Sequence, residues 1–127
     1  MNPFFTEDHE DLRALAADFA GLCDAMSRCQ ADGGLFHDVL DDVKTFYESE
    51  TAEMFAYSIY NMVSWRKLDD RYLEYADLAR RTVTERVDAD GIIRGCSGSP
   101  TFEQEGTSVE GQAHFIMMEA AAQRLGR

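Results

Sequence analysis

Two adjacent carboxylates, Asp41 and Asp42, form the pair in this sequence that most resembles an acid and base couple. General acid and base catalysis needs one group that gives a proton and another that takes it. Adjacent residues in a loop point apart, however, and aspartates there usually cap turns or meet solvent. We therefore expect a structural role for Asp41 and Asp42.

Metal and cofactor chemistry have no sequence signature. The three histidines are scattered along the chain. No pairing of a histidine with a cysteine or carboxylate recurs at a spacing of three or four residues, as it would in a metal site on a helix. The sequence contains no GxGxxG, P-loop or GxSxG motif. We expect no metal and no cofactor, and we interpret His114, on an apolar segment, as a hydrogen-bonded core histidine.

The charge balance limits the partners of this protein. The 127 residues contain 24 Asp and Glu against 12 Lys and Arg, giving a formal net charge of -12, and 45% of them are hydrophobic. That apolar content is enough to exclude general disorder. The negative charge argues against nucleic acid and anionic membrane surfaces as partners. It fits a protein adapted to high salt, and it fits an ordinary acidic cytosolic protein equally well.

Several features predict a cytoplasmic protein. The residues 1–9 are polar and acidic, unlike a secretory signal. The longest apolar stretches, near 54–65 and 113–122, fall short of the roughly 20 residues that span a membrane. The three cysteines show no CxxC spacing, which predicts free thiols in a reducing compartment.

Apolar periodicity predicts four helices of two kinds. Residues 8–29 and 68–87 are amphipathic, whereas 51–65 and 108–124 are apolar nearly all round, with Glu53 the only charge in 51–65. We expect the second and fourth helices to be buried, and the first and third to lie outside. The expected buried stripe of the first helix is Leu12, Leu15, Ala16, Phe19, Leu22, Cys23 and Met26.

The four helices form two copies of one unit. Asp32-Gly33 and Asp90-Gly91 are 58 residues apart, and each follows an outer helix and precedes a loop, 35–48 or 92–107. Glycine ends helices readily, because it adopts the left-handed backbone conformation of the final turn. This period is longer than that of common two-helix solenoids and favours a concentric helical toroid. We predict one partial domain, 1–127, with helical hairpins 8–65 and 68–124; a compact four-helix arrangement is the alternative. Two hairpins cannot close a ring, so the inner helices would show apolar surface unless something covers them.

The segment 35–57 carries a family resemblance. It reads LFHDVLDDVKTFYESETAEMFAY, and it is similar without a gap to the unsaturated glucuronyl and rhamnogalacturonyl hydrolases, glycoside hydrolase families 88 and 105. Those families typically read Leu, aromatic, His, Val-Leu-Asp-Asp, then Tyr-x-Glu-Thr-Ser and Ala-Met-Phe-Ala-Tyr. The Asp-Gly to Cys-x-Gly loop at 90–98 and the Ser-x-x-Gly-x-Ala run at 108–113 also match.

The resemblance implies an all-α fold, an (α/α)6 barrel of six hairpins, of which this chain would supply about the last third. It implies hydration of the C4=C5 double bond in a 4,5-unsaturated uronic acid, started by an aspartic acid that acts as general acid and base. Such an acid must be held protonated. By resemblance, that aspartate and the stacking tryptophans belong to earlier hairpins and lie outside this sequence.

The resemblance also places candidate substrate-binding residues at the loop end of the inner helices. Ser108 is the leading candidate for a sugar contact, with N-capping as its structural alternative. His37 corresponds to the family's loop histidine, and the alternative is that it holds backbone carbonyls. We interpret Glu48 as a helix cap. The further rim candidates are Glu110, Arg94, which could meet a uronate carboxylate, and Cys96.

Three interpretations remain open from the sequence. The first is a partial unsaturated uronyl hydrolase whose activity needs the missing hairpins, from another chain or from a homo-oligomer. The second is a non-catalytic helical module that keeps the scaffold for binding or assembly. The third is an incomplete gene product without a function of its own.

Overall fold

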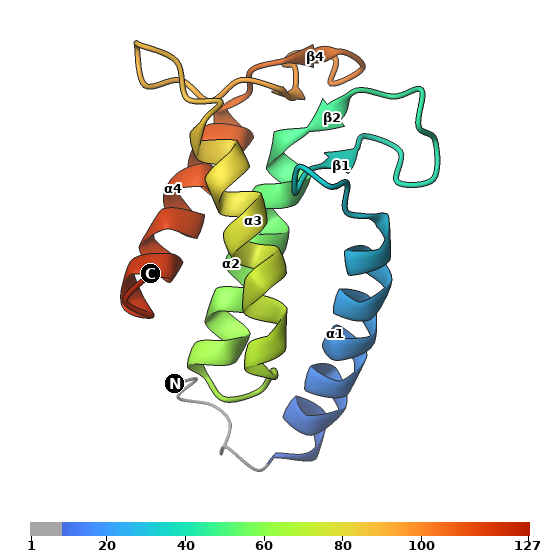
Figure 1. The fold of residues 1–127 in the computed structure, drawn as a ribbon, viewed down its shortest axis with the longest axis vertical. Helices are drawn as coiled ribbons and strands as arrows, with labels where there is room; N and C mark the ends of the chain where they lie inside the picture. Colours follow the sequence, from blue (N-terminus) through green and yellow to red (C-terminus); the bar gives the residue numbers. More distant parts are fainter. Residues whose placement is uncertain (1–8) are drawn as a thin grey trace.

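The computed structural model describes residues 9–127, and it is predominantly helical (Figure 1). The elements are α1 (Glu10–Cys29), β1 (Phe36–His37), β2 (Tyr47–Glu48), α2 (Ser49–Ser64), η1 (Asp70–Tyr72), α3 (Leu73–Thr84), β3 (Cys96–Ser97), β4 (Glu105–Gly106) and α4 (Val109–Arg124). The predicted all-α class is confirmed. Residues 1–8, where we expected the first helix to begin, lie outside the described residues.

Each half of the chain consists of a helix, a short two-stranded ribbon and a second helix. β1 pairs with β2 and β3 with β4, both antiparallel. Both ribbons lie at the same end of the helices, where α1 and α3 end and α2 and α4 begin (Figure 1). α2 and α4 each have 16 residues, and α4 begins 60 residues after α2.

α2 is the centre of the core. Ala52, Ala56, Ile59 and Tyr60 are fully buried, because α2 packs against both α3 and α4. The prediction of a buried second helix is therefore confirmed over most of 51–65, with Met54, Ser64 and Trp65 exposed. The side chains of Met54 and Trp65 are 47% and 57% exposed. Trp65 follows the last helical residue, Ser64, and lies at the edge of the packed region.

The buried face of α3 follows the sequence prediction, but the α-helix begins at Leu73, five residues after the predicted Leu68, because Asp70–Tyr72 form the separate 3-10 turn η1. The inward side chains of α3, Leu73, Ala76, Ala79 and Val83, are buried at steps of three and four residues. The helix ends at Thr84, earlier than the predicted Val87, and Asp88 forms the following turn by accepting hydrogen bonds from the backbone N–H groups of Asp90 and Ile92.

Two burial predictions are wrong. α4 was expected to be buried like α2, yet its buried residues are Gly111, Met118, Ala121 and Ala122, on the side that faces α2 and α3. In α1, Leu15 and Leu22 were expected inside and are 62% and 55% exposed. The reason is the same for both helices: each has neighbours on one side within this chain, and its remaining face is open.

The hydroxyl of Tyr60 ties α2 to α3. It donates to Asp77 Oδ1 at 2.9 Å from a side chain with no exposed surface. Burial, followed by this hydrogen bond, raises the pKa of Tyr60 above its usual range. Tyr60→Phe should therefore lower the free energy of unfolding by about 1 kcal/mol, the usual net value of one buried hydrogen bond. Urea unfolding of this variant and of Tyr57→Phe, on the same helix, measures the difference; equal losses would contradict the assignment.

Candidate functional site

The ribbon end of the molecule is held together by hydrogen bonds between the two halves of the chain. Ser97 N–H donates to Glu48 Oε1 at 2.9 Å. Ser49 donates through its hydroxyl to the Arg94 carbonyl at 2.8 Å and through its N–H to the Gly95 carbonyl at 2.7 Å. The second loop is therefore fixed directly on the N-terminus of α2.

Glu48 joins two of these elements. Its Oε2 accepts a hydrogen bond from Thr51 N–H at 2.5 Å, and its side chain is 3% exposed. The predicted helix-capping role is confirmed, and a carboxylate is favourable at this positive end of the helix dipole. The bond to Ser97 means that the same carboxylate also positions β3.

Glu53 is the most unusual side chain of this region. It has no exposed surface, and neither carboxylate oxygen has a hydrogen-bond partner. Burial, and then repulsion from Glu48 and Glu50, raises its pKa from 4.5 to about 8. Glu53 therefore holds its proton at neutral pH. Sequence reasoning noted it only as the single charge of an apolar helix, which was the signal available.

His37 lies on β1 and is partly buried. Its Nδ1 is 2.7 Å from the Thr45 carbonyl, and its ring stacks on Tyr47 with centroids 4.4 Å apart. These contacts support the alternative that His37 holds a backbone carbonyl. They fix the ring within the first ribbon at the rim.

Ser108 and Glu110 lie at the start of α4. The Ser108 hydroxyl accepts a hydrogen bond from Gly111 N–H at 2.9 Å, so this residue caps the helix, and it is 8% exposed. The Glu110 side chain is exposed. A sugar contact by either residue stays a prediction.

Cys96 lies beneath the rim. Its thiol is fully buried, and burial, together with nearby Glu53, raises its pKa to about 12, so it is no nucleophile at neutral pH. A side chain on Gly111 would put Cβ 2.4 Å from the Cys96 sulfur, which shows how closely β3 approaches α4.

Arg94 is exposed and already has an anionic partner. Its Nε donates to Asp88 Oδ2 at 2.7 Å. The backbone N–H of Ile92 and the guanidinium of Arg94 hold the pKa of Asp88 below its usual value. A uronate carboxylate would have to share Arg94 with Asp88.

The other polar residues singled out from the sequence have structural partners. Asp42 Oδ1 accepts from Lys44 N–H at 3.0 Å, and Asp41 is exposed, as predicted for a turn. His114 is half-buried, with Nδ1 2.8 Å from Glu50 Oε1. The hydrogen bond agrees with the interpretation of His114, but the ring is half-buried and lies outside the buried core.

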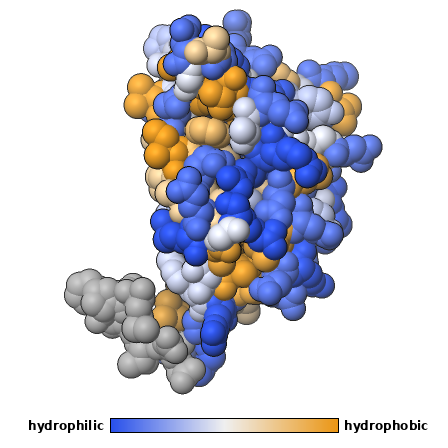
Figure 2. Space-filling model, turned by 60° about the vertical axis from the view of Figure 1, so that its left-hand side comes forward, coloured by the Kyte–Doolittle hydropathy of each residue, from blue (hydrophilic) through white to orange (hydrophobic). Residues whose placement is uncertain are grey.

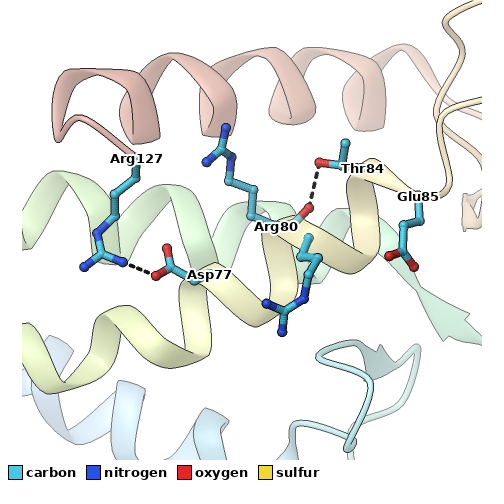
Figure 3. A pocket seen from close by; sticks show the side chains of 6 residues that line it. Asp77, Arg80, Thr84, Glu85 and Arg127 are labelled. Atoms are coloured by element: carbon cyan, nitrogen blue, oxygen red, sulfur yellow. Dashed lines mark hydrogen bonds and ion pairs between the residues drawn. The ribbon is translucent and has the colours of Figure 1, made fainter.

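A shallow hollow of about 530 Å³ lies on α3 beside the end of α4 (Figure 3). It is lined by Asp77, Arg80, Arg81, Thr84, Glu85 and Arg127, none of which was a candidate. Arg80 forms two hydrogen bonds with Glu119, at 2.7 and 2.8 Å, and Arg127 pairs with Asp77. Arg80 and Arg127 are therefore already neutralised, and neither guanidinium is free to meet an anionic sugar.

Over residues 9–127, no three His, Cys, Asp or Glu side chains are arranged to hold a metal ion. In the same part of the chain, no helix combines the length and apolar character needed to cross a membrane. The cysteines Cys23, Cys29 and Cys96 are free thiols.

The family model Glycosyl Hydrolase Family 88 matches residues 3–125. The chain belongs to this family. This match confirms the resemblance seen in the loop motifs: the chain is a relative of the unsaturated glucuronyl and rhamnogalacturonyl hydrolases. No curated protein matches the chain.

Two solved structures share the fold of this family 88 chain. Each is described as a possible member of the GH105 family, one from Salmonella enterica serovar Paratyphi A and one from Klebsiella pneumoniae. They match over 97% of this chain, with TM-scores of 0.87 and 0.88 and sequence identities of 23% and 24%. The chain spans 35% of the length of each. The toroid fragment predicted from the repeat is therefore the observed fold, in place of an unrelated four-helix arrangement.

Proposed function

We propose that this chain forms part of the sugar-binding rim of a hydrolase acting on 4,5-unsaturated uronyl oligosaccharides. The family match over residues 3–125 carries the proposal. The fold supports it, because both ribbons and the N-termini of both inner helices meet at one end of the molecule (Figure 1). Helix N-termini favour anionic ligands, and a uronate is one.

The substrate contacts proposed from the sequence divide into two groups. Glu110, Arg94 and His37 retain exposed surface, which supports a sugar contact by each of them. Ser108 and Cys96 are buried, at 8% and 0% exposure, and therefore offer less surface to a ligand. Ser108 keeps its hydroxyl proton for donation, since its oxygen accepts from Gly111.

The proton donor is proposed to lie outside this chain. Hydration of a C=C bond starts with a proton delivered to carbon, and a neutral carboxylic acid can supply it. Glu53 is such an acid, but its side chain has no exposed surface and therefore no access to a ligand. Asp41 is solvent-exposed and Asp42 caps a turn, so neither has the apolar surroundings that keep an acid protonated.

A non-catalytic binding or assembly module is the second candidate. It is favoured by the structural duties of the candidate residues: Ser108 caps α4, His37 holds Thr45 and Arg94 pairs with Asp88. In this alternative the scaffold binds sugar without turnover. The three free thiols are consistent with the cytoplasmic location that we propose for either function.

The test is to incubate the purified chain with an unsaturated uronyl disaccharide and follow the ultraviolet absorbance of its conjugated double bond. We expect no loss of absorbance, because the acid is missing, and saturable binding by calorimetry. Turnover by this chain alone would disprove the proposal that the proton donor lies outside it. Glu110→Gln should weaken binding by about threefold to tenfold, through loss of one charged hydrogen bond, and Glu103→Gln serves as the control. Absence of any binding would contradict the proposed rim.

A further inference from the structure

α4 presents an open face along its whole length. The residues of this face recur at steps of three and four and are all exposed: Val109, Ala113, Ile116, Ala120 and Gln123. Val109 is 81% exposed and Ile116 60%. Figure 2, in which the side of the molecule bearing α4 comes forward, shows apolar groups gathered between polar ones on this surface. Apolar side chains in such a row usually mark a contact surface.

The equivalent face of α2 is covered. The residues 60 positions earlier are Ser49, Glu53, Ala56, Tyr60 and Val63, and their exposed fractions are 0% for the first four and 9% for Val63. Tyr60 contacts Asp77 of α3, and Ser49 contacts Arg94 of the following loop. The second hairpin therefore covers the face of α2 that is equivalent to the open face of α4.

α1 is the counterpart of α3 in this repeat, since each precedes a ribbon and an inner helix. It carries two exposed leucines, Leu15 and Leu22, seven residues apart and therefore on one face. α1 and α4 run in opposite directions, as do α3 and α2 (Figure 1). The chain thus holds both halves of an interface that resembles its own α2–α3 contact.

The dipoles of the two open helices also match. The first turn of α1 is acidic, with Glu10 and Asp11, and the last turn of α4 carries Arg124. Both turns lie away from the ribbons (Figure 1). The Arg124 guanidinium donates to Asn61 Oδ1 of α2 at 2.9 Å, so it lies beside the open face of α4 and not on it. An antiparallel pairing of α1 with α4 would bring opposite ends of the helix dipoles together.

We propose that the α4 face of one copy docks against the α1 face of a second copy, and that three copies close a ring. A head-to-tail contact of this kind forms a closed ring when the rotation from one copy to the next is a whole fraction of a full turn. Each copy supplies two hairpins, and its length is 35% of each solved relative, close to one third of a complete barrel. The ring rests on the fold and is independent of the proposed activity.

The first test is the mass of the intact chain in solution, by sedimentation equilibrium in about 1 M KCl. Salt at this concentration has a screening length of about 3 Å, so it suppresses repulsion between copies of net charge -12. We expect three times the chain mass of 14.3 kDa. A folded species of 14.3 kDa would overturn the proposal and assign the α4 face to further hairpins of a longer polypeptide.

Two variants make the test specific. Ile116→Asp should break the α4 face and Leu22→Asp the α1 face, each raising the dissociation constant by about 30-fold or more and giving monomers. Because both side chains are exposed within one copy, the monomers should keep their helical circular dichroism. Val43→Asp, exposed by 79% in the first loop, is the matched control and should leave the trimer intact.

Mixing the two variants then tests the head-to-tail geometry. Ile116→Asp keeps an intact α1 face and Leu22→Asp an intact α4 face, so one sound interface can form. We expect a dimer containing one copy of each variant, and nothing larger. A mixture that stays monomeric, or a trimer that survives either substitution, would show that these faces do not pair. Sugar binding and turnover are measured separately, so failure of the ring and failure of the proposed function are distinguishable.

Discussion

Replacing Glu53 by glutamine is expected to stabilise the folded chain at pH 8 by about 2 to 4 kcal/mol and to change its stability little near pH 4.5. Glu53 is fully buried with no hydrogen-bond partner for either oxygen, and burial raises its pKa from 4.5 to about 8. Glutamine has nearly the same shape as the protonated acid and carries no charge at any pH.

The sign follows from proton binding. Between pH 4.5 and 8, folded Glu53 keeps a proton that the unfolded chain has released. The contribution of this group to stability is therefore complete below about pH 4.5, falls as the pH rises, and is lost above about pH 8. A pKa difference of this size corresponds to at most about 5 kcal/mol, and relaxation or water entry in the charged state reduces it.

Urea unfolding at several pH values, at one protein concentration, measures the effect. The difference between parent and Glu53→Gln should grow steadily from pH 5 to 8. The control is Glu103→Gln, which changes an exposed carboxylate and should follow the parent at every pH. Parallel curves for the parent and Glu53→Gln would show that Glu53 is not a buried neutral acid.

Replacing Gly34 by alanine should destabilise the chain by about 3 kcal/mol or more. Gly34 has a φ of 91°, and an added Cβ would lie 2.8 Å from the backbone carbon and oxygen of Leu78. The left-handed conformation costs an alanine about 1–2 kcal/mol, and the contact with a helix backbone cannot relax cheaply. The substitution would push the first loop away from α3.

Two other glycines separate these costs. Gly91 has a φ of 80° with nothing within 4 Å, so Gly91→Ala should cost about 1–2 kcal/mol, from the backbone conformation alone. Gly33 has neither a positive φ nor a near neighbour, and Gly33→Ala should be neutral or slightly stabilising. The expected order of melting temperatures is Gly33→Ala, Gly91→Ala, Gly34→Ala, from highest to lowest. If Gly34→Ala melts with Gly33→Ala, the close approach to Leu78 is wrong.

Gly34 and Glu53 both lie where a loop contacts a helix. Gly34 lets the first loop contact α3, and the Thr82 hydroxyl donates to the Gly33 carbonyl beside it. Glu53 lies under the second loop, near Cys96. Neither residue touches a ligand in the proposed function. Both determine whether the rim keeps its shape.

The sequence by itself determined the helices, their repeat and the family. Periodicity in 51–65 and 68–87 predicted α2 as a buried helix and α3 as a half-buried one, because burial on folding requires apolar side chains at helical spacing. The loop motifs predicted the family, and two of their residues fix loop geometry here: Glu48 caps α2, and Gly111 lets β3 approach α4.

The tertiary structure decided which apolar faces are covered and which polar groups are free. α4 and α2 look alike in sequence, yet α4 is open because no third hairpin lies beside it in this chain. Ser108, the leading candidate, and Arg94 and Cys96, the further candidates at the rim, all have partners within the chain: Gly111, Asp88 and the packed β3–α4 contact. Burial and hydrogen bonding depend on residues far apart in the chain, so the local periodicity of the sequence does not predict them.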